Sequence, residues 1–133
     1  PYAILLLLPL ATALSWSYRW RSIEKRPCFY FNLEEANLKA NFYFSVVDAK
    51  NEGIKSAVDA VIYGPNNQVL HSVAGKSHTE FPITSGMTGE HSLCMTLTED
   101  SPPGVERNID LDLTIFRPDG SVYVPKAAKS HVQ

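Results

Sequence analysis

Short runs in which apolar and polar residues alternate dominate the sequence from residue 14 onward. The clearest run is 108–116, in which every second residue is apolar: Ile109, Leu111, Leu113 and Ile115. Successive side chains of a β-strand point to opposite faces, so this alternation predicts a strand with one buried face. Asp110 and Asp112 are then expected to face solvent or a partner.

The same pattern, rich in Val, Ile, Phe and Tyr, predicts seven further strands, at 14–20, 28–31, 41–47, 57–63, 69–74, 80–84 and 91–97. Turn-forming residues at 64–67 predict a hairpin between the fourth and fifth of these strands, and those at 85–89 predict another between the sixth and seventh. Residues 34–39 are too few for an independent helix and are expected to be loop. About eight short strands predict an all-β chain folded as an antiparallel β-sandwich.

Composition supports one folded domain. A chain of 133 residues with 44% apolar and 20% charged residues can bury a core, and it is within the usual length of a single domain. Its net charge of -2 and scattered basic residues provide no positive field that would attract a polyanion. We therefore expect no nucleic-acid partner.

The first thirteen residues form an apolar run that ends in the small-x-small pattern of Ala11 and Ala13. This is the pattern of a secretory signal peptide and its cleavage site, and the run is too short to span a bilayer. A buried first strand is the alternative interpretation. Because neither Met nor a basic region precedes Pro1, we expect 1–13 to be a signal peptide truncated at its start.

The expected secretion of the chain bears on the redox state of its two cysteines, Cys28 and Cys94. Paired thiols are oxidised in the lumen of the endoplasmic reticulum, so a disulfide between them is expected. The alternative is a nucleophilic cysteine assisted by His91, which would need a free thiolate and a third group to orient the base.

Other candidate site residues are few. The four histidines, His71, His78, His91 and His131, suggest a hypothesis of pH-dependent partner binding, against the alternative of ordinary surface residues. Asp110 and Asp112 have a spacing open to calcium, although no Asp-rich loop supplies further ligands. The acidic, proline-stiffened segment 99–104 makes Glu99 and Asp100 candidate partner-binding residues together with His91.

Catalytic and cofactor motifs are missing from the sequence. It contains no nucleophile elbow, phosphate-binding loop, zinc-protease helix or paired-cysteine zinc spacing. We expect no enzyme activity, no metal and no cofactor.

Four segments together resemble the GOLD (Golgi dynamics) domain of the TMED family of transmembrane cargo receptors. The most specific segment is Phe81 to Thr84 (FPIT) followed, after a turn, by Gly89 to Cys94 (GEHSLC). The other three are similar to the family's first cysteine segment, its strand–turn–strand unit and its last strand, at 26–35, 61–70 and 109–113. Departures occur at Pro82 and Ile83, where a second aromatic residue is usual, and at Gly64.

The resemblance implies a jelly-roll or immunoglobulin-like sandwich at 14–118, with 119–133 approaching a coiled-coil stalk absent from this chain. It also implies a receptor for lumenal cargo in membranes of the endoplasmic reticulum, Golgi and transport vesicles. Such a receptor forms homo- or hetero-oligomers with family members, crosses the membrane through a C-terminal helix and engages vesicle coats through a tail. Alternatives from other classes are a secreted immunoglobulin-like or lectin-type binding module and a secreted hydrolase.

Overall fold

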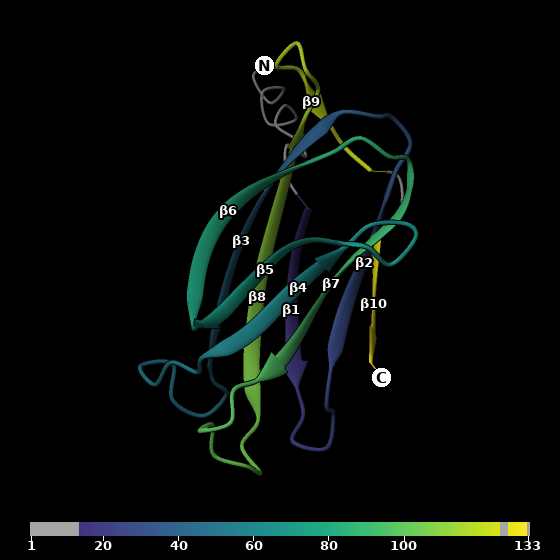
Figure 1. Ribbon diagram of the computed structural model, residues 1–133. Helices are drawn as coiled ribbons and strands as arrows, with labels where there is room; N and C mark the ends of the chain where they lie inside the picture. Colours follow the sequence, from purple (N-terminus) through teal and green to yellow (C-terminus); the bar gives the residue numbers. More distant parts are fainter. Residues whose placement is uncertain (1–13, 126–127, 133) are drawn as a thin grey trace, which may run out of the picture.

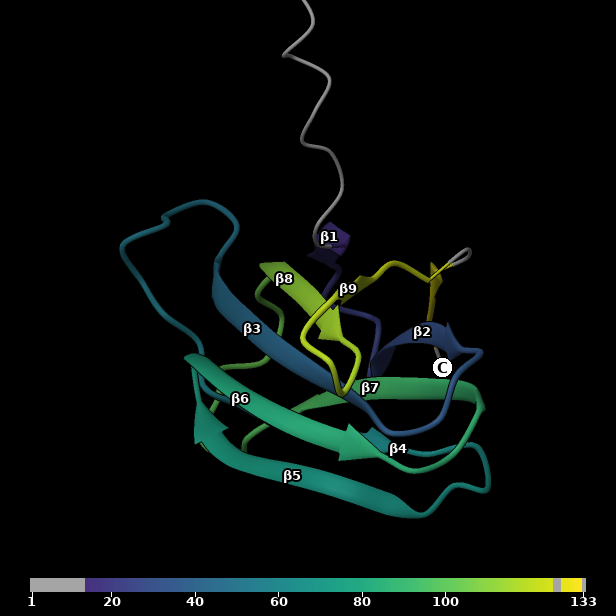
Figure 2. The same ribbon diagram turned by 90° about the horizontal axis from the view of Figure 1, so that it is seen from above.

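The computed structural model describes residues 14–125 and the backbone of 128–132, which fold into two antiparallel sheets packed face to face (Figures 1 and 2). Sheet A has the strand order β1-β8-β3-β6, with β9 also paired to β8. Its strands are β1 (Leu14–Trp20), β8 (Arg107–Phe116), β3 (Leu38–Asp48), β6 (His78–Ser85) and β9 (Val122–Tyr123).

Sheet B has the order β10-β2-β7-β4-β5. Its strands are β10 (Ala128–Val132), β2 (Pro27–Leu33), β7 (Gly89–Leu97), β4 (Val58–Tyr63) and β5 (Val69–Lys76). The predicted all-β sandwich is therefore confirmed. The described residues contain no helix of the length and hydropathy that crossing a bilayer requires.

Alternating side chains of both sheets build the core. In sheet A, Phe42 lies opposite Leu113 and Phe44 lies opposite Leu111, and all four are buried. Phe31 from sheet B packs edge-on against Phe42 with ring centroids 5.5 Å apart. Asp110 and Asp112 are exposed, as the alternation predicts, while Leu14, Trp16 and Tyr18 of β1 pack against one side of the core.

One of the two predicted hairpins is confirmed and the other is wrong. β4 and β5 pair as expected, with register shifts between Val58/Ala60 and Ile62/Tyr63. The residues at 85–89, however, carry the chain from β6 in sheet A to β7 in sheet B. Gly89 adopts a φ of 125°, and a Cβ there would lie 3.1 Å from Cβ of Pro65. Turn-forming residues predict a change of direction, but they do not predict which strands pair afterwards.

Strand β3 begins at Leu38, so only residues 34–37 of the expected loop lie outside a strand. At the other end of the chain, β9 and β10 lie beyond residue 118, where we placed the end of the domain. Tyr123 is buried, and its hydroxyl accepts a hydrogen bond from Glu34 N–H at 3.0 Å. The sandwich thus extends past 118. The stalk itself stays a prediction, and the signal peptide lies outside the described residues.

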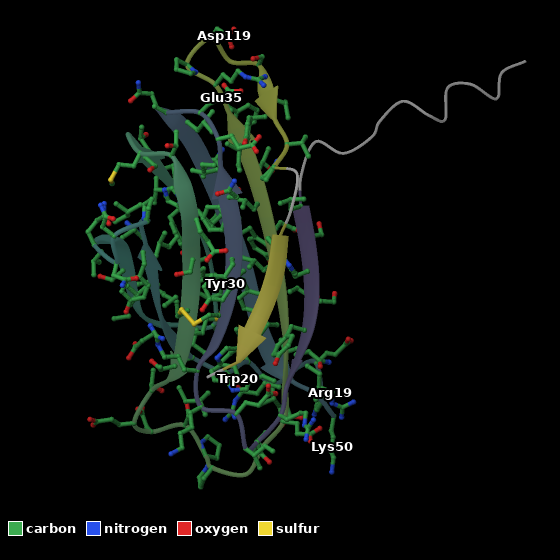
Figure 3. The ribbon with its side chains drawn as sticks, turned by 90° about the vertical axis from the view of Figure 1, so that its right-hand side faces the viewer. Arg19, Trp20, Tyr30, Glu35, Lys50 and Asp119 are labelled. Carbon is green, nitrogen blue, oxygen red and sulfur yellow. A yellow bond between two sulfur atoms is a disulfide. The ribbon has the colours of Figure 1, made fainter. Side chains whose placement is uncertain are left out.

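Cys28 of β2 lies directly opposite Cys94 of β7, and the two sulfur atoms are bonded. Because Phe29 and Phe31 face the core, the alternation places the disulfide on the outer side of sheet B, where it appears as the yellow bond in Figure 3. The predicted disulfide is confirmed, and it excludes the alternative of a free cysteine nucleophile.

Candidate functional site at the loop end

Three loops meet at one end of the sandwich, drawn at the bottom of Figure 1. They connect β1 to β2 (21–26), β3 to β4 (49–57) and β7 to β8 (98–106). Their positions follow from the register of sheet A, because Trp20 and Asp48 both lie opposite Arg107. We call this region, residues 21–26, 49–57 and 98–106, the loop end. In Figure 3, Lys50 of the loop end and the neighbouring Arg19 of β1 lie at one end of the sandwich, while Glu35 and Asp119 lie at the opposite end.

The buried side chain of Arg107 connects two of these loops, 49–57 and 98–106. Its side chain is buried, with Nε donating to Ser56 Oγ at 2.8 Å and Nη1 and Nη2 donating to the carbonyls of Val105 and Pro102 at 2.8 and 3.0 Å. Burial lowers the pKa of Arg107, and the nearby Asp48 carboxylate opposes that shift. A buried cation with its donors satisfied is a rigid anchor, so the loops 49–57 and 98–106 are held in place.

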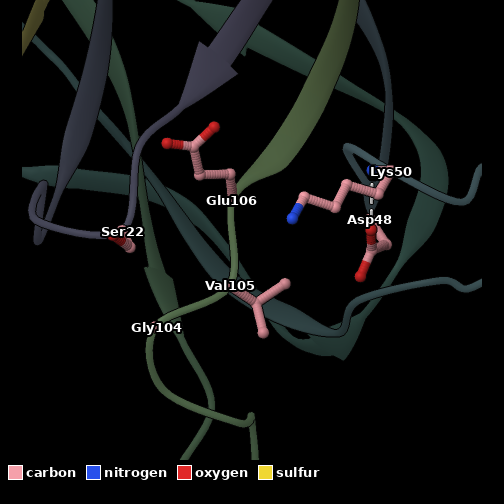
Figure 4. Close-up of a pocket in the computed structure, with 6 residues that line it drawn as sticks. All are labelled: Ser22, Asp48, Lys50, Gly104, Val105 and Glu106. Carbon is pink, nitrogen blue, oxygen red and sulfur yellow. Dashed lines mark hydrogen bonds between the residues drawn. The ribbon is translucent and has the colours of Figure 1, made fainter.

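A cavity of about 410 Å³ opens between the loops (Figure 4), lined by Ser22, Asp48, Lys50, Gly104, Val105 and Glu106. Asp48 Oδ1 accepts hydrogen bonds from the backbone N–H groups of Lys50 and Asn51, at 2.7 and 3.1 Å. In Figure 4 the side chain of Lys50 extends into the space between Asp48 and Glu106. The cavity therefore contains charges of both signs beside the apolar Val105.

Two isoleucines project from the loops around this cavity. Ile23 is 74% exposed and Ile54 is 53% exposed. Each is flanked by basic residues, in the sequences Arg-Ser-Ile-Glu-Lys at 21–25 and Lys-Asn-Glu-Gly-Ile-Lys at 50–55. Exposed aliphatic side chains beside polar groups are typical of the centre and rim of protein interfaces. The alternation pattern did not reveal them, although an isolated isoleucine within a charged turn is a signal that could have.

Glu99 and Asp100, two of the predicted partner-binding residues, are exposed on the loop 98–106. Thr98 and Ser101 close a tight turn around them, since Ser101 N–H donates to the Thr98 carbonyl at 3.1 Å. The structure therefore brings these acidic residues to the same end as Ile23 and Ile54. Their part in binding stays a prediction.

His91, the third predicted partner-binding residue, has no exposed surface, so the expectation that it contacts a partner is wrong for this structure. Nδ1 lies 2.9 Å from the Gly89 carbonyl, and Nε2 lies 2.7 Å from Ser85 Oγ. Since a carbonyl only accepts, Nδ1 carries the proton and Nε2 accepts from the serine hydroxyl. The ring stacks on Phe31 and joins β7 of sheet B to the end of β6 in sheet A.

This burial predicts a pH-dependent stability. It lowers the pKa of His91 below 6.5, and the bond to the Gly89 carbonyl opposes that shift. The unfolded chain then takes up a proton that the folded domain does not. The free energy of unfolding therefore falls as the pH drops below about 6.5, by up to about 1.4 kcal/mol per pH unit, until the folded-state pKa is reached.

Urea unfolding at pH values of about 7.2 and 5.5 measures this effect. The His91→Gln variant should lose less stability than the wild type between the two values, because its side chain does not titrate. Equal losses would show that His91 is protonated as readily in the folded domain as in the unfolded chain.

The other two histidines with described side chains, His71 and His78, lie in different surroundings. His71 is half-buried and stacks on Phe81, with ring centroids 4.4 Å apart, whereas His78 is exposed. His131 belongs to β10, whose side chains lie outside the description. The hypothesis of joint titration at one partner surface therefore has no geometric support from the described histidines.

Asp110 and Asp112 accept hydrogen bonds from serines of the neighbouring strand β1. Ser17 Oγ donates to Asp110 at 2.8 Å, and Ser15 Oγ donates to Asp112 at 2.6 Å. Among the described residues, no group of three or more His, Cys, Asp or Glu side chains is placed to hold a metal ion.

Solved structures with a similar fold include PliG from Aeromonas hydrophila, a periplasmic inhibitor of g-type lysozyme. It has 8% sequence identity and a TM-score of 0.52, with 79% of this chain and 87% of PliG covered. The Yersinia pseudotuberculosis-derived mitogen follows with 11% identity, coverage of 86% and 97%, and a TM-score of 0.49. At such identities PliG shows the fold alone. Comparison with curated protein sequences found no match.

The family relation comes from the sequence. Residues 22–133 match the model of the emp24/gp25L/p24 family/GOLD, which covers both cysteines, all of the loop end except residue 21, and strands β2 to β10. This confirms the resemblance drawn from the cysteine and glycine segments, because TMED proteins are the p24 family. The chain therefore belongs to the emp24/gp25L/p24 family of GOLD-domain proteins, whose general role is transport between the endoplasmic reticulum and the Golgi apparatus.

Proposed function

We propose that this domain is the lumenal binding module of a p24-type receptor, and that it contacts lumenal cargo proteins through the loop end. The observation that carries the proposal is the pair of exposed isoleucines, Ile23 and Ile54, on two loops around a cavity that contains Lys50. Apolar anchors surrounded by polar groups supply most of the binding energy at protein interfaces. Because Arg107 fixes the loops 49–57 and 98–106 beforehand, binding through them would cost little ordering entropy.

The family relation supports the other parts of the proposal. Family members would assemble with this chain as homo- or hetero-oligomers, a C-terminal helix would anchor the protein in the membrane, and a cytosolic tail would engage the vesicle coat. The domain would bind and sort cargo without converting it chemically. Glu99 and Asp100 would contribute a polar rim to the binding surface at the loop end.

The test compares cargo association of the full-length receptor in cells. Chemical crosslinking followed by quantitative mass spectrometry should recover secretory cargo with the wild type and about thirtyfold less with an Ile23→Ser/Ile54→Ser variant, because interface anchors typically contribute about 1 kcal/mol or more each. Both residues are solvent-exposed, so the variant should fold and reach the same membranes.

Val69→Ser is the matched control. Val69 is 60% exposed on β5, outside the loop end, so its replacement removes exposed aliphatic surface away from the proposed contact. Cargo recovery should be unchanged in this variant. An equal loss in both variants, or full recovery with the double variant, would exclude the loop end as the cargo-binding surface.

A further inference from the structure

The outer face of sheet A carries polar rows that cross its strands. Two neighbouring rows run across β6, β3, β8 and β1: Glu80–Tyr43–Asp112–Ser15 and His78–Ser45–Asp110–Ser17. A hollow of about 560 Å³ lies over the first row, with Tyr43 between Glu80 and Asp112 and with Asn41 and Thr114 beside it. This face is separate from the loop end.

Tyr43 is the unusual residue of this face, with 38% of its surface exposed. Among the exposed large apolar side chains of the described residues, it alone stands on a strand that has neighbours on both sides. Part of the Tyr43 ring at this position is therefore not packed against the rest of the domain and is open to solvent. It supplies a flat, apolar floor for a ligand group.

The surroundings of Tyr43 carry negative charge. The two rows contain three carboxylates, those of Glu80, Asp110 and Asp112, and no lysine or arginine. The basic residues of this face, Lys39 and Arg19, each stand four positions along their strand from the first row, about 13 Å away at the rise of a β-strand. Arg19 is moreover paired with Glu106 at 2.9 Å.

We propose that the hollow over Tyr43 binds a lysine or arginine side chain presented by a basic segment of a partner protein. The cation would lie on the Tyr43 ring, whose face attracts positive charge. Glu80 and Asp112 flank the ring at one strand spacing on each side, so their backbones are about 10 Å apart and both carboxylates reach toward a cation between them. Asp112 uses Oδ1 for Ser15, which leaves Oδ2 for the partner.

The negative charge of this face favours a basic segment over two other possible ligands, a second copy of the domain and a divalent cation. Two copies of this face brought together would oppose six carboxylates, so like-charge repulsion disfavours a symmetric dimer through it. A divalent cation would need further converging ligands, and no group of three or more His, Cys, Asp or Glu side chains among the described residues is placed to hold one. A basic partner segment complements both the Tyr43 ring and the carboxylates of Glu80 and Asp112 that flank it.

The test uses the isotope-labelled protein and the peptide acetyl-(Arg-Gly)₄-amide at low ionic strength, where exposed charges are least screened. Amide shifts in NMR spectra should move at Tyr43, Glu80 and Asp112, and the dissociation constant should rise with salt. Glu80→Gln/Asp112→Asn should weaken binding about fivefold, as expected from the loss of two exposed ion pairs. Tyr43→Leu should weaken it further, whereas Tyr43→Phe, which keeps the ring, should not.

Glu34→Gln/Asp119→Asn is the matched control, since it removes the same charge from two exposed positions outside the acidic rows. Asp119 and Glu35, the chain neighbour of Glu34, lie at the end of the sandwich opposite the loop end (Figure 3). It should leave peptide binding unchanged. Equal weakening by both double variants would show non-specific attraction and overturn the proposal. Concentration-dependent shifts at Tyr43 without peptide would identify a second copy as the occupant, and calcium-induced shifts there would identify a metal. Either result would overturn the proposal without affecting the test of the loop end.

Discussion

Replacing both cysteines, Cys28→Ala and Cys94→Ala, is expected to lower the free energy of unfolding by about 4 kcal/mol. The disulfide joins residues that are 66 positions apart. Closing so long a loop removes many conformations from the unfolded chain, which is the main source of stabilisation by a disulfide in the chain-entropy account. Because domains of this size are stable by only about 5 to 15 kcal/mol, the variant should lose between about a quarter and four fifths of its stability.

Urea unfolding of the non-reduced wild type and the double variant measures the loss. Ser92→Ala is the control, because Ser92 lies two positions from Cys94 on the same outer side of β7 and is only half-buried. That variant should lose less than about 1 kcal/mol. Mass spectrometry after alkylation provides an independent check: two modified thiols in the folded wild type would mean that the bond does not form.

Positions of strands could be predicted from the sequence because a half-buried strand repeats every two residues. In β8, the four apolar residues between 109 and 115 are all buried, and both intervening aspartates are exposed. Such a pattern depends only on which side of one sheet faces the core. The hairpin of β4 and β5 was equally local, since the turn-forming residues at 64–67 join strands that are neighbours in the sheet.

Partners of strands could not be predicted in the same way. The segment 85–89 has the composition of a hairpin turn, yet β6 pairs with β3 and β7 pairs with β2 and β4. The choice depends on how the two sheets pack, which involves residues far apart in the sequence. β9 was missed because two residues give no alternation, and its place depends on the buried Tyr123 and its bond to Glu34.

The candidate site was predicted only in part, because it too depends on contacts between residues far apart in the sequence. Glu99 and Asp100 were found because acidic, proline-containing loops are exposed in most folds. His91 was misplaced, since its burial depends on Ser85 and Phe31 from other strands. Each of Ile23 and Ile54 stands in a charged turn, but that they belong to one surface becomes clear only when three separate loops meet at one end.

The second large effect is expected for Leu111→Ala, which should lower the free energy of unfolding by about 2 to 5 kcal/mol. Leu111 is buried in β8, where it lies opposite Trp16 of β1 and Phe44 of β3. Its truncation would remove apolar contacts at the centre of sheet A. It would also leave a cavity that the two neighbouring strands, held by their ladders, cannot close.

Asp112→Asn is the control one residue further along the same strand. Its side chain is exposed, and an asparagine keeps the Oδ1 that accepts the Ser15 hydroxyl, so the loss should stay below about 0.5 kcal/mol. Urea titration of both variants compares the two faces of β8 directly. Since a shift of one residue would exchange these faces, equal losses would contradict the register of sheet A and the position of the acidic hollow that depends on it.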